Sequence, residues 1–113
     1  RVNIEAKDFE PCFQDDLHPH SRQFFLKFFE ESDFVLRRRI LTFITGLTSV
    51  PFDGISSLNV KIALTVYGMA LEDLLPRSST CIKTLYLAPI PDYETFKTKF
   101  MTTLDAPLLF GLN

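Results

Sequence analysis

The one candidate nucleophile in this 113-residue sequence is Cys81, which lies in the stretch LPRSSTCIKTLYLAP. A thiol attacks a carbonyl carbon as its thiolate, and cationic neighbours such as Arg77 and Lys83 favour that form. The stretch passes from a Pro/Ser/Thr turn into an apolar run, so Cys81 would lie on the loop side of a strand, where side chains are accessible. Free cysteines are also among the most buried residues, and the chemistry alone slightly favours a structural Cys81 in the core.

A cysteine hydrolase would need a general base close to its thiol. The only histidines, His18 and His20, lie at the start of the first expected helix, and nothing in the sequence brings them to Cys81. A thiol without a base suits a different reaction, the acceptance of an acyl group from another thioester, because exchange between thiols is close to thermoneutral. The chemistry therefore favours acyl relay over hydrolysis.

Charge and composition argue against several classes of partner and bound group. The net charge of −2 leaves no broad cationic surface for a phosphate backbone, so we expect no nucleic-acid partner. Cys12 and Cys81 lie far apart, and with two histidines they make no recognisable zinc spacing, so we expect no metal. The sequence also has no glycine-rich phosphate loop, no H-E-x-x-H and no G-x-S-x-G, and we expect no cofactor.

The use of cysteine and the hydropathy pattern indicate a compartment. Two separated thiols favour a reducing one, the cytoplasm or the nucleus. The longest charge-free run, residues 40–52, is too short to span a bilayer and contains Gly46 and Pro51, so we expect no membrane partner. The sequence opens at Arg1 without a Met or an apolar leader, which favours a piece of a longer protein.

Helical periodicity predicts two helices after residues 1–17, a lead-in without a sustained period. The first helix has Ser21 as a plausible N-cap, and the second has Asp33 as N-cap and Gly46 as its stop. Residues 37–39, three consecutive arginines, splay around the second helix, which favours a solvated face over an anion or partner patch. The apolar stripes are Phe24, Phe25, Phe28 and Phe29 in the first helix, and Leu36, Ile40, Phe43, Ile44 and Leu47 in the second.

The second half of the chain alternates in the manner of strands. Residues 60–67 show a period of two, residues 76–80 read as a turn, and residues 81–88 read as a second strand with Leu85 and Leu87 on one face. Asp92 is the expected N-cap of a final helix over residues 93–104, and an apolar tail follows. This order predicts a small α/β (α+β) domain, with a short sheet packed against three to four helices.

Three segments together resemble one known family. ILTFITGLTSVPFDGISSL resembles a helix ending in F-x-T-G followed by a V-P-x-x-G-[FI] loop, LLPRSSTCIKTLYLAP resembles L-P-x-x-x-T-C-x-x-x-L-x-L-P, and FGLN resembles the carboxyl terminus of that family. With their order and spacing, these segments identify residues 18–113 as similar to the catalytic C-terminal lobe of a HECT-type ubiquitin ligase. Residues 1–17 would then be the hinge from the preceding lobe.

The resemblance implies a role for specific residues. Cys81 would accept ubiquitin as a thioester from a ubiquitin-conjugating enzyme and pass it to a substrate lysine. Pro76, Ser79 and Thr80 would position the ubiquitin tail, and Phe110, four places from the end, would act in transfer to lysine. The implied partners are ubiquitin, the conjugating enzyme, bound through an N-terminal lobe outside this chain, and protein substrates.

This sequence also departs from the family pattern. Many members have His or Asn in place of Ser79 and Asn in place of Lys83, and LYLAPIPDY is longer than the usual segment by two residues. These departures leave the nucleophile in place and concern the contacts with ubiquitin. A different class of function stays open: a non-catalytic module of the same fold that binds ubiquitin or a partner, with Cys81 structural.

Overall fold

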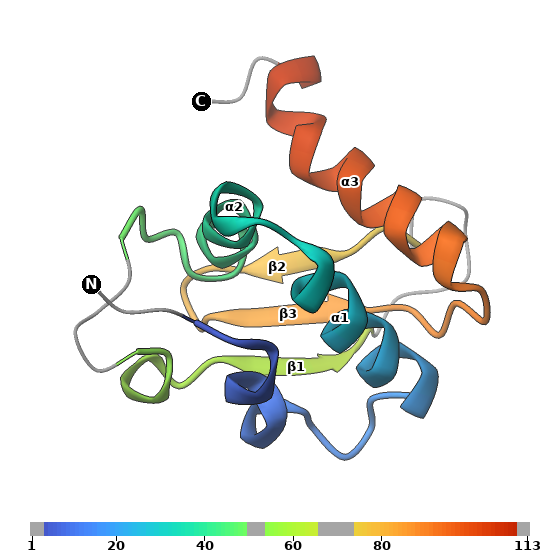
Figure 1. Cartoon of the computed structure of the whole chain (residues 1–113), viewed down its shortest axis with the longest axis horizontal. Helices are drawn as coiled ribbons and strands as arrows, with labels where there is room; N and C mark the ends of the chain where they lie inside the picture. Colours follow the sequence, from blue (N-terminus) through green and yellow to red (C-terminus); the bar gives the residue numbers. More distant parts are fainter. Residues whose placement is uncertain (1–3, 50–53, 66–73, 111–113) are drawn as a thin grey trace.

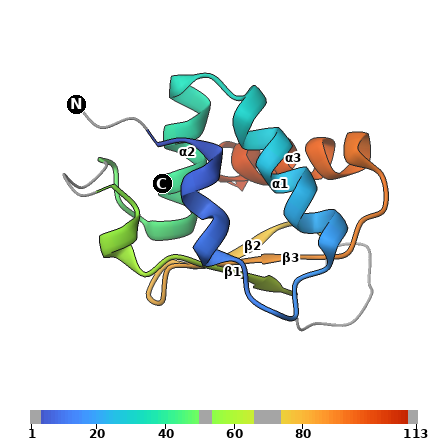
Figure 2. The ribbon, with the colours of Figure 1, turned by 60° about the horizontal axis from the view of Figure 1, so that its bottom comes forward.

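The computed structural model describes residues 4–49, 54–65 and 74–110, with side chains up to residue 106. Its sheet has three strands in the order β1-β3-β2. β1 (Lys61–Leu64) is parallel to β3 (Thr84–Leu87), and β2 (Arg77–Ser79) is antiparallel to it. Figures 1 and 2 show the helices of the described chain on one face of this sheet. The expected α+β domain with a short sheet is confirmed.

The first two α-helices follow one another directly. α1 (Pro19–Glu31) begins after His18, whose Nδ1 accepts a hydrogen bond from the His20 N–H, and Pro19 occupies the first helical position. The expected N-cap, Ser21, is wrong: its buried hydroxyl instead donates to the Ala88 carbonyl at 3.0 Å. Ser21 therefore joins the first turn of α1 to the end of β3.

α2 (Phe34–Thr45) begins and ends where the sequence predicted. Asp33 Oδ1 accepts from the Leu36 N–H at 2.8 Å, and Gly46 caps the other end with a left-handed φ of 76°. Ile40 and Ile44 are fully buried, as the apolar stripe required. Leu47, expected in the same stripe, is 41% exposed because it lies beyond the cap, where the helical period no longer applies.

Aromatic side chains fill the space between the helices and the sheet. Phe25, Phe28 and Phe29 of α1 are buried, as predicted, and the Phe28 ring lies 5.0 Å from that of Phe100 in α3 (Tyr93–Phe110). Edge-to-face contacts such as that between Phe9 and Phe25, at 5.0 Å and 81°, add to the burial of apolar area. The core thus joins elements from both ends of the described chain.

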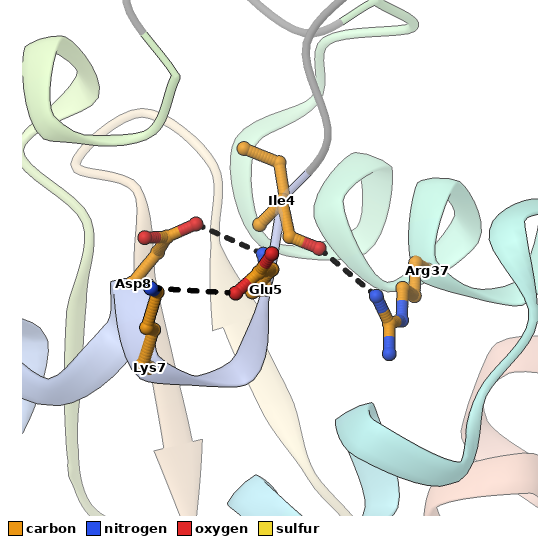
Figure 3. Close-up of polar contacts among 5 residues, drawn as sticks. All are labelled: Ile4, Glu5, Lys7, Asp8 and Arg37. Carbon is orange, nitrogen blue, oxygen red and sulfur yellow. Dashed lines mark hydrogen bonds and ion pairs between the residues drawn. The ribbon is translucent and has the colours of Figure 1, made fainter.

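Part of the expected lead-in also belongs to this core. Residues 4–17 include a 3-10 helix, η1 (Ala6–Cys12), on which Phe9 is fully buried. Figure 3 shows how the segment is held: the Glu5 N–H donates to Asp8 Oδ2 at 2.9 Å, and Arg37 Nη1 donates to the Ile4 carbonyl at 3.1 Å. Sequence periodicity missed η1 because its seven residues are too few to show a period. The division of the chain at residue 17 stays a prediction.

The arginines of α2, expected to form a solvated face, are exposed at Arg38 and half-buried at Arg37 and Arg39, and each also bonds within the chain. Arg37 donates to the Phe29, Glu30 and Ile4 carbonyls, and its guanidinium lies 4.9 Å from the centroid of the Phe29 ring. Arg38 donates to the Thr48 carbonyl. Arg39 lies 2.8 Å from Asp105 Oδ1, which connects α2 to the later part of α3.

α3 is longer than the sequence predicted. Asp92 Oδ2 accepts from the Thr95 N–H and from the Thr95 hydroxyl, each at 2.8 Å, and starts the helix as expected. These two bonds lower the pKa of the Asp92 carboxyl. Phe96 and Phe100 are buried, as predicted, but the helix continues to Phe110 rather than ending at residue 104. The expectation that the apolar tail docks concerns side chains outside the described part of the chain.

Candidate functional site

Cys81 lies in the turn of a β-hairpin. β2 ends at Ser79 and β3 begins at Thr84, so residues 80–83 form the connection. Within it, the Ile82 N–H donates to the Ser79 carbonyl at 3.2 Å and the Lys83 N–H donates to the Thr80 carbonyl at 3.3 Å. Two corrections follow: residues 77–79 are a strand rather than part of a turn, and the strand expected from residue 81 begins three residues later.

The end of the turn has a strained backbone that is fixed by the neighbouring strand. Lys83 has a left-handed φ of 51°, which L-residues other than Asn, Asp and Gly rarely adopt. Its carbonyl accepts from the Lys61 N–H at 3.0 Å, so the hydrogen bonds of the β1–β3 ladder extend into the turn. Asn would therefore suit the backbone at this position better than Lys.

The beginning of the turn lies against the end of α2. A Cβ atom placed on Gly46 would lie 3.3 Å from Thr80 Cβ, so the helix cap and the turn are in close contact. Figure 1 shows the end of α2 beside the left end of the β2–β3 hairpin. Thr80, the residue immediately before Cys81, is thus positioned by α2, a helix that lies far from it in the sequence.

The two cysteines have opposite environments. Cys81 is exposed, so it does not fill the core, whereas Cys12 on η1 is buried. Burial, with a smaller contribution from the nearby Asp8 carboxylate, raises the pKa of the Cys12 thiol to about 11. The structural environment that the chemistry alone slightly favoured for Cys81 belongs to Cys12.

The histidines lie at the other end of the sheet from Cys81. His18 and His20 begin α1, which Ser21 ties to Ala88 just after β3, while Cys81 precedes β3. The four residues of β3 alone separate the two ends by roughly 10 Å. In Figure 1 the hairpin turn is at the left end of the sheet and α1 begins at the right. A Cys-His pair is therefore not assembled, as the sequence led us to expect.

Of the other predicted site residues, the structure places Ser79 and Thr80 at the turn and Pro76 at the far end of β2, beyond the Arg77–Tyr86 pair. Pro76 is buried directly before β2, and Ser79 is half-buried opposite Thr84 at the end of the hairpin ladder. Thr80 is exposed and adjoins Cys81. Phe110 is the last residue of α3, and its side chain lies outside the described residues, so its role stays a prediction.

Two further residues belong to this region, and sequence reasoning did not assign them to it. Ile82 is 58% exposed beside the thiol. The sequence placed this apolar residue in an expected strand rather than in a turn, so its exposure was not predicted. Gly46 was predicted only as a helix stop, because nothing in the sequence relates it to Thr80. A local sequence pattern predicts the conformation of a residue but not which distant residue it contacts.

The described ranges contain no group of three or more His, Cys, Asp or Glu side chains that could hold a metal ion. Among the helices of these same ranges, none is both long enough and apolar enough to cross a bilayer.

Comparison of the sequence with known proteins places this chain in a family. The sequence model of the family described as HECT-domain (ubiquitin-transferase) matches residues 3–113. Human E3 ubiquitin-protein ligase HECW1 is 33% identical over 81 residues, which cover 67% of this chain and 5% of that protein. Human E3 ubiquitin-protein ligase HECW2 is 34% identical over 79 residues, again 67% and 5%.

A more distant relative covers more of the chain. HUL4 of Eremothecium gossypii, whose name also includes E3 ubiquitin-protein ligase, is 29% identical over 89 residues, 79% of this chain and 10% of that protein. The chain therefore spans a small part, 5 to 10%, of the curated relatives it matches. Because the family match extends over nearly the whole sequence, the chain belongs to the HECT-domain (ubiquitin-transferase) family.

Proposed function

We propose that Cys81 is the residue through which this chain transfers ubiquitin. The observation that carries the proposal is the exposed thiol in a hairpin turn whose two sides are held by different elements. Family membership supports ubiquitin as the group transferred, since the relatives are named ubiquitin-protein ligases. In a fixed turn the thiol can be accessible while its backbone keeps one position, which suits a nucleophile that must meet a large acyl donor.

Two displacements make up the proposed reaction. The Cys81 thiolate attacks the carbonyl carbon of the ubiquitin C-terminal glycine, held as a thioester on a conjugating enzyme, and the thiolate of that enzyme leaves. A substrate lysine amine then attacks the same carbonyl carbon, an isopeptide bond forms, and the Cys81 thiolate leaves as the amine loses its proton to solvent. The first step exchanges one thioester for another and needs no general base, which agrees with the distance of His18 and His20 from the turn.

The residues before Cys81 would receive the ubiquitin tail. The exposed Thr80 and the half-buried Ser79 form the edge of the turn that an extended peptide would reach first. Pro76, buried one residue before β2, would fix the direction in which that strand enters the hairpin. Ile82, 58% exposed on the other side of the thiol, would offer an apolar contact to the same partner.

The remaining partners are also proposals. The resemblance implies that a larger N-terminal lobe recruits the conjugating enzyme, so we infer that recruitment uses sequence outside these 113 residues. Protein substrates are expected as lysine donors, and the cytoplasm or nucleus as the compartment, because a free catalytic thiol requires reducing conditions.

The reaction can be tested without a conjugating enzyme. The folded chain is incubated with ubiquitin that carries a thiol-reactive group at its C-terminus, and the covalent adduct is followed by intact mass. Wild type and Cys12→Ala should form one adduct, and Cys81→Ala should form none. An absent wild-type adduct, or one located on Cys12, would contradict the proposal.

The role proposed for Phe110 needs a longer ligase that contains this chain. Deletion of residues 110–113 should leave thioester formation largely intact and slow the transfer to lysine, because the tail would align the acceptor. The two steps are separated by measuring loading and discharge in single-turnover reactions. Equal loss of both steps would remove this role from Phe110.

The competing function is a binding module in which Cys81 takes no part. Because Cys81 is exposed, such a module would carry an exposed thiol that lies away from the bound ubiquitin C-terminus. The two functions differ in one outcome, since the module would bind ubiquitin equally well with Cys81→Ala and would form no adduct in the wild type.

A further inference from the structure

We propose that Gly46 is a positioning residue for Cys81. It has no Cβ, and this lets the hairpin turn lie directly against the C-terminal end of α2 and fixes Thr80, the residue before the thiol. This inference rests on the proposed function, because it concerns the geometry in which Cys81 meets the ubiquitin tail. Figure 1 shows the end of α2 beside this end of the hairpin.

The helix side of the contact is rigid. The Gly46 N–H donates to the Thr42 carbonyl at 2.8 Å, and the Thr42 hydroxyl donates to the Leu47 carbonyl at 2.8 Å. The buried Thr45 hydroxyl donates to the Leu41 carbonyl at 2.7 Å and accepts from the Leu47 N–H at 3.1 Å. These bonds hold the backbone on both sides of Gly46, so a new side chain there could not be accommodated by moving the helix cap.

The turn would have to move instead. A Cβ on Gly46 would lie 3.3 Å from Thr80 Cβ and 3.6 Å from its Cγ2, close enough that the neighbour must give by a few tenths of an ångström. The later part of the turn is held by the Lys61 N–H bond to the Lys83 carbonyl at 3.0 Å. The displacement would therefore fall on Thr80 and Cys81, between the helix cap and this anchor.

Such a displacement affects large and small reactants differently. A small alkylating reagent approaches an exposed thiol from many directions, so its rate follows exposure and thiolate content alone. The ubiquitin tail must lie along Thr80 before its carbonyl carbon can meet the sulfur, and misplacement by about 1 Å can cost roughly a hundredfold in such a step. The ratio of the two rate constants therefore reports position rather than folding.

The chain offers a matched control for the backbone. Gly54 has the same φ of 76° as Gly46, but a Cβ there would meet only Ile4 Cδ1, at an ordinary 3.9 Å. Gly54→Ala therefore introduces the same left-handed strain without crowding the turn. Gly46→Asn is a second variant at the site, because Asn tolerates the left-handed region and keeps α2 capped while retaining the crowding Cβ.

The experiment compares wild type, Gly46→Ala, Gly46→Asn and Gly54→Ala at a temperature where circular dichroism shows all four folded. For each, rate constants are measured with iodoacetamide and with ubiquitin carrying a C-terminal electrophile. We expect both Gly46 variants to lower the ubiquitin rate roughly fivefold with an unchanged iodoacetamide rate, and Gly54→Ala to resemble wild type. Equal ratios in the Gly46 and Gly54 variants would overturn the role of Gly46 alone, whereas no wild-type adduct would overturn the proposed function and this inference together.

Discussion

The environments of Cys12 and Cys81 show how one residue type acquires opposite chemistry within a small domain. Cys12 lies on η1, which also carries the fully buried Phe9, and burial raises the pKa of the Cys12 thiol to about 11. Cys81 lies in a turn that is fixed from two sides and is nevertheless exposed. The difference teaches that a reactive position combines a rigid backbone with an accessible side chain, whereas a structural one loses access and ionisation together.

The largest expected contrast is in alkylation. At pH 8, about one Cys12 thiol in a thousand would be ionised if its pKa is about 11, and the side chain is only 8% exposed. We therefore expect iodoacetamide to modify Cys81 at least about a hundredfold faster than Cys12. Peptide mapping of the partly labelled chain measures both rates in one sample. Comparable rates at the two cysteines in the folded chain would break the comparison, and addition of urea should remove the contrast.

The apolar residues near the two cysteines should also differ, in their effect on stability. Phe9 is fully buried against Phe25 and Phe29, so Phe9→Ala should lower the free energy of unfolding by about 3–5 kcal/mol. Ile82 is 58% exposed, and Ile82→Ala should change it by less than about 0.5 kcal/mol. Urea unfolding followed by circular dichroism measures both values. A small effect of Phe9→Ala would mean that η1 is not part of the core.

The raised pKa of Cys12 also predicts a pH dependence of stability. The folded state holds the Cys12 proton more tightly than the unfolded chain does, because the thiol has the ordinary pKa of 9.0 in the unfolded chain. The contribution is fully present below pH 9 and is lost as the pH rises toward 11, because only the unfolded chain then ionises readily. Wild type should therefore lose more stability than Cys12→Ala between pH 9 and pH 11, measured by urea unfolding. Parallel pH profiles would show that the thiol of Cys12 ionises equally in both states.

The smallest effect is expected in the turn itself. Lys83 has a left-handed φ of 51°, which Asn adopts at lower cost, so Lys83→Asn should stabilise the chain by roughly 0.5 kcal/mol. The thermal midpoint of wild type and variant gives the sign directly. A lower midpoint would mean that the Lys side chain contributes more than the backbone loses.

Much of the fold could be predicted where short-range chemistry determines it. Asp33, Gly46 and Asp92 were found as helix boundaries because capping depends on residues within one turn. The aromatic stripe of α1 was found because a period of 3.6 residues requires a buried face. Ser21 failed as an N-cap because its hydroxyl bonds to Ala88, 67 residues away in the sequence.

The same distinction between short-range and long-range effects applies to the candidate site. The motif made Cys81 the candidate nucleophile. Its exposure could not be predicted, because the same Pro/Ser/Thr context would suit a turn or a buried strand end. β2 was missed because its three residues, Arg77–Ser79, carry no alternating apolar pattern and are held by pairing with β3. The contact between Gly46 and Thr80 depends on how α2 crosses the sheet, which no local pattern encodes.

The central claim is that the fold makes Cys81 a ubiquitin acceptor, and transfer from a ubiquitin thioester tests it most directly. Ubiquitin activated as the thioester of a small alkyl thiol is mixed with the folded chain and, separately, with a peptide of residues 75–89, and intact mass is followed under non-reducing conditions. We predict that wild type and Cys12→Ala gain one ubiquitin, faster than the peptide, in a bond that excess thiol cleaves, and that Cys81→Ala gains none. Transfer to Cys12, or a folded chain no faster than the peptide, would contradict the account.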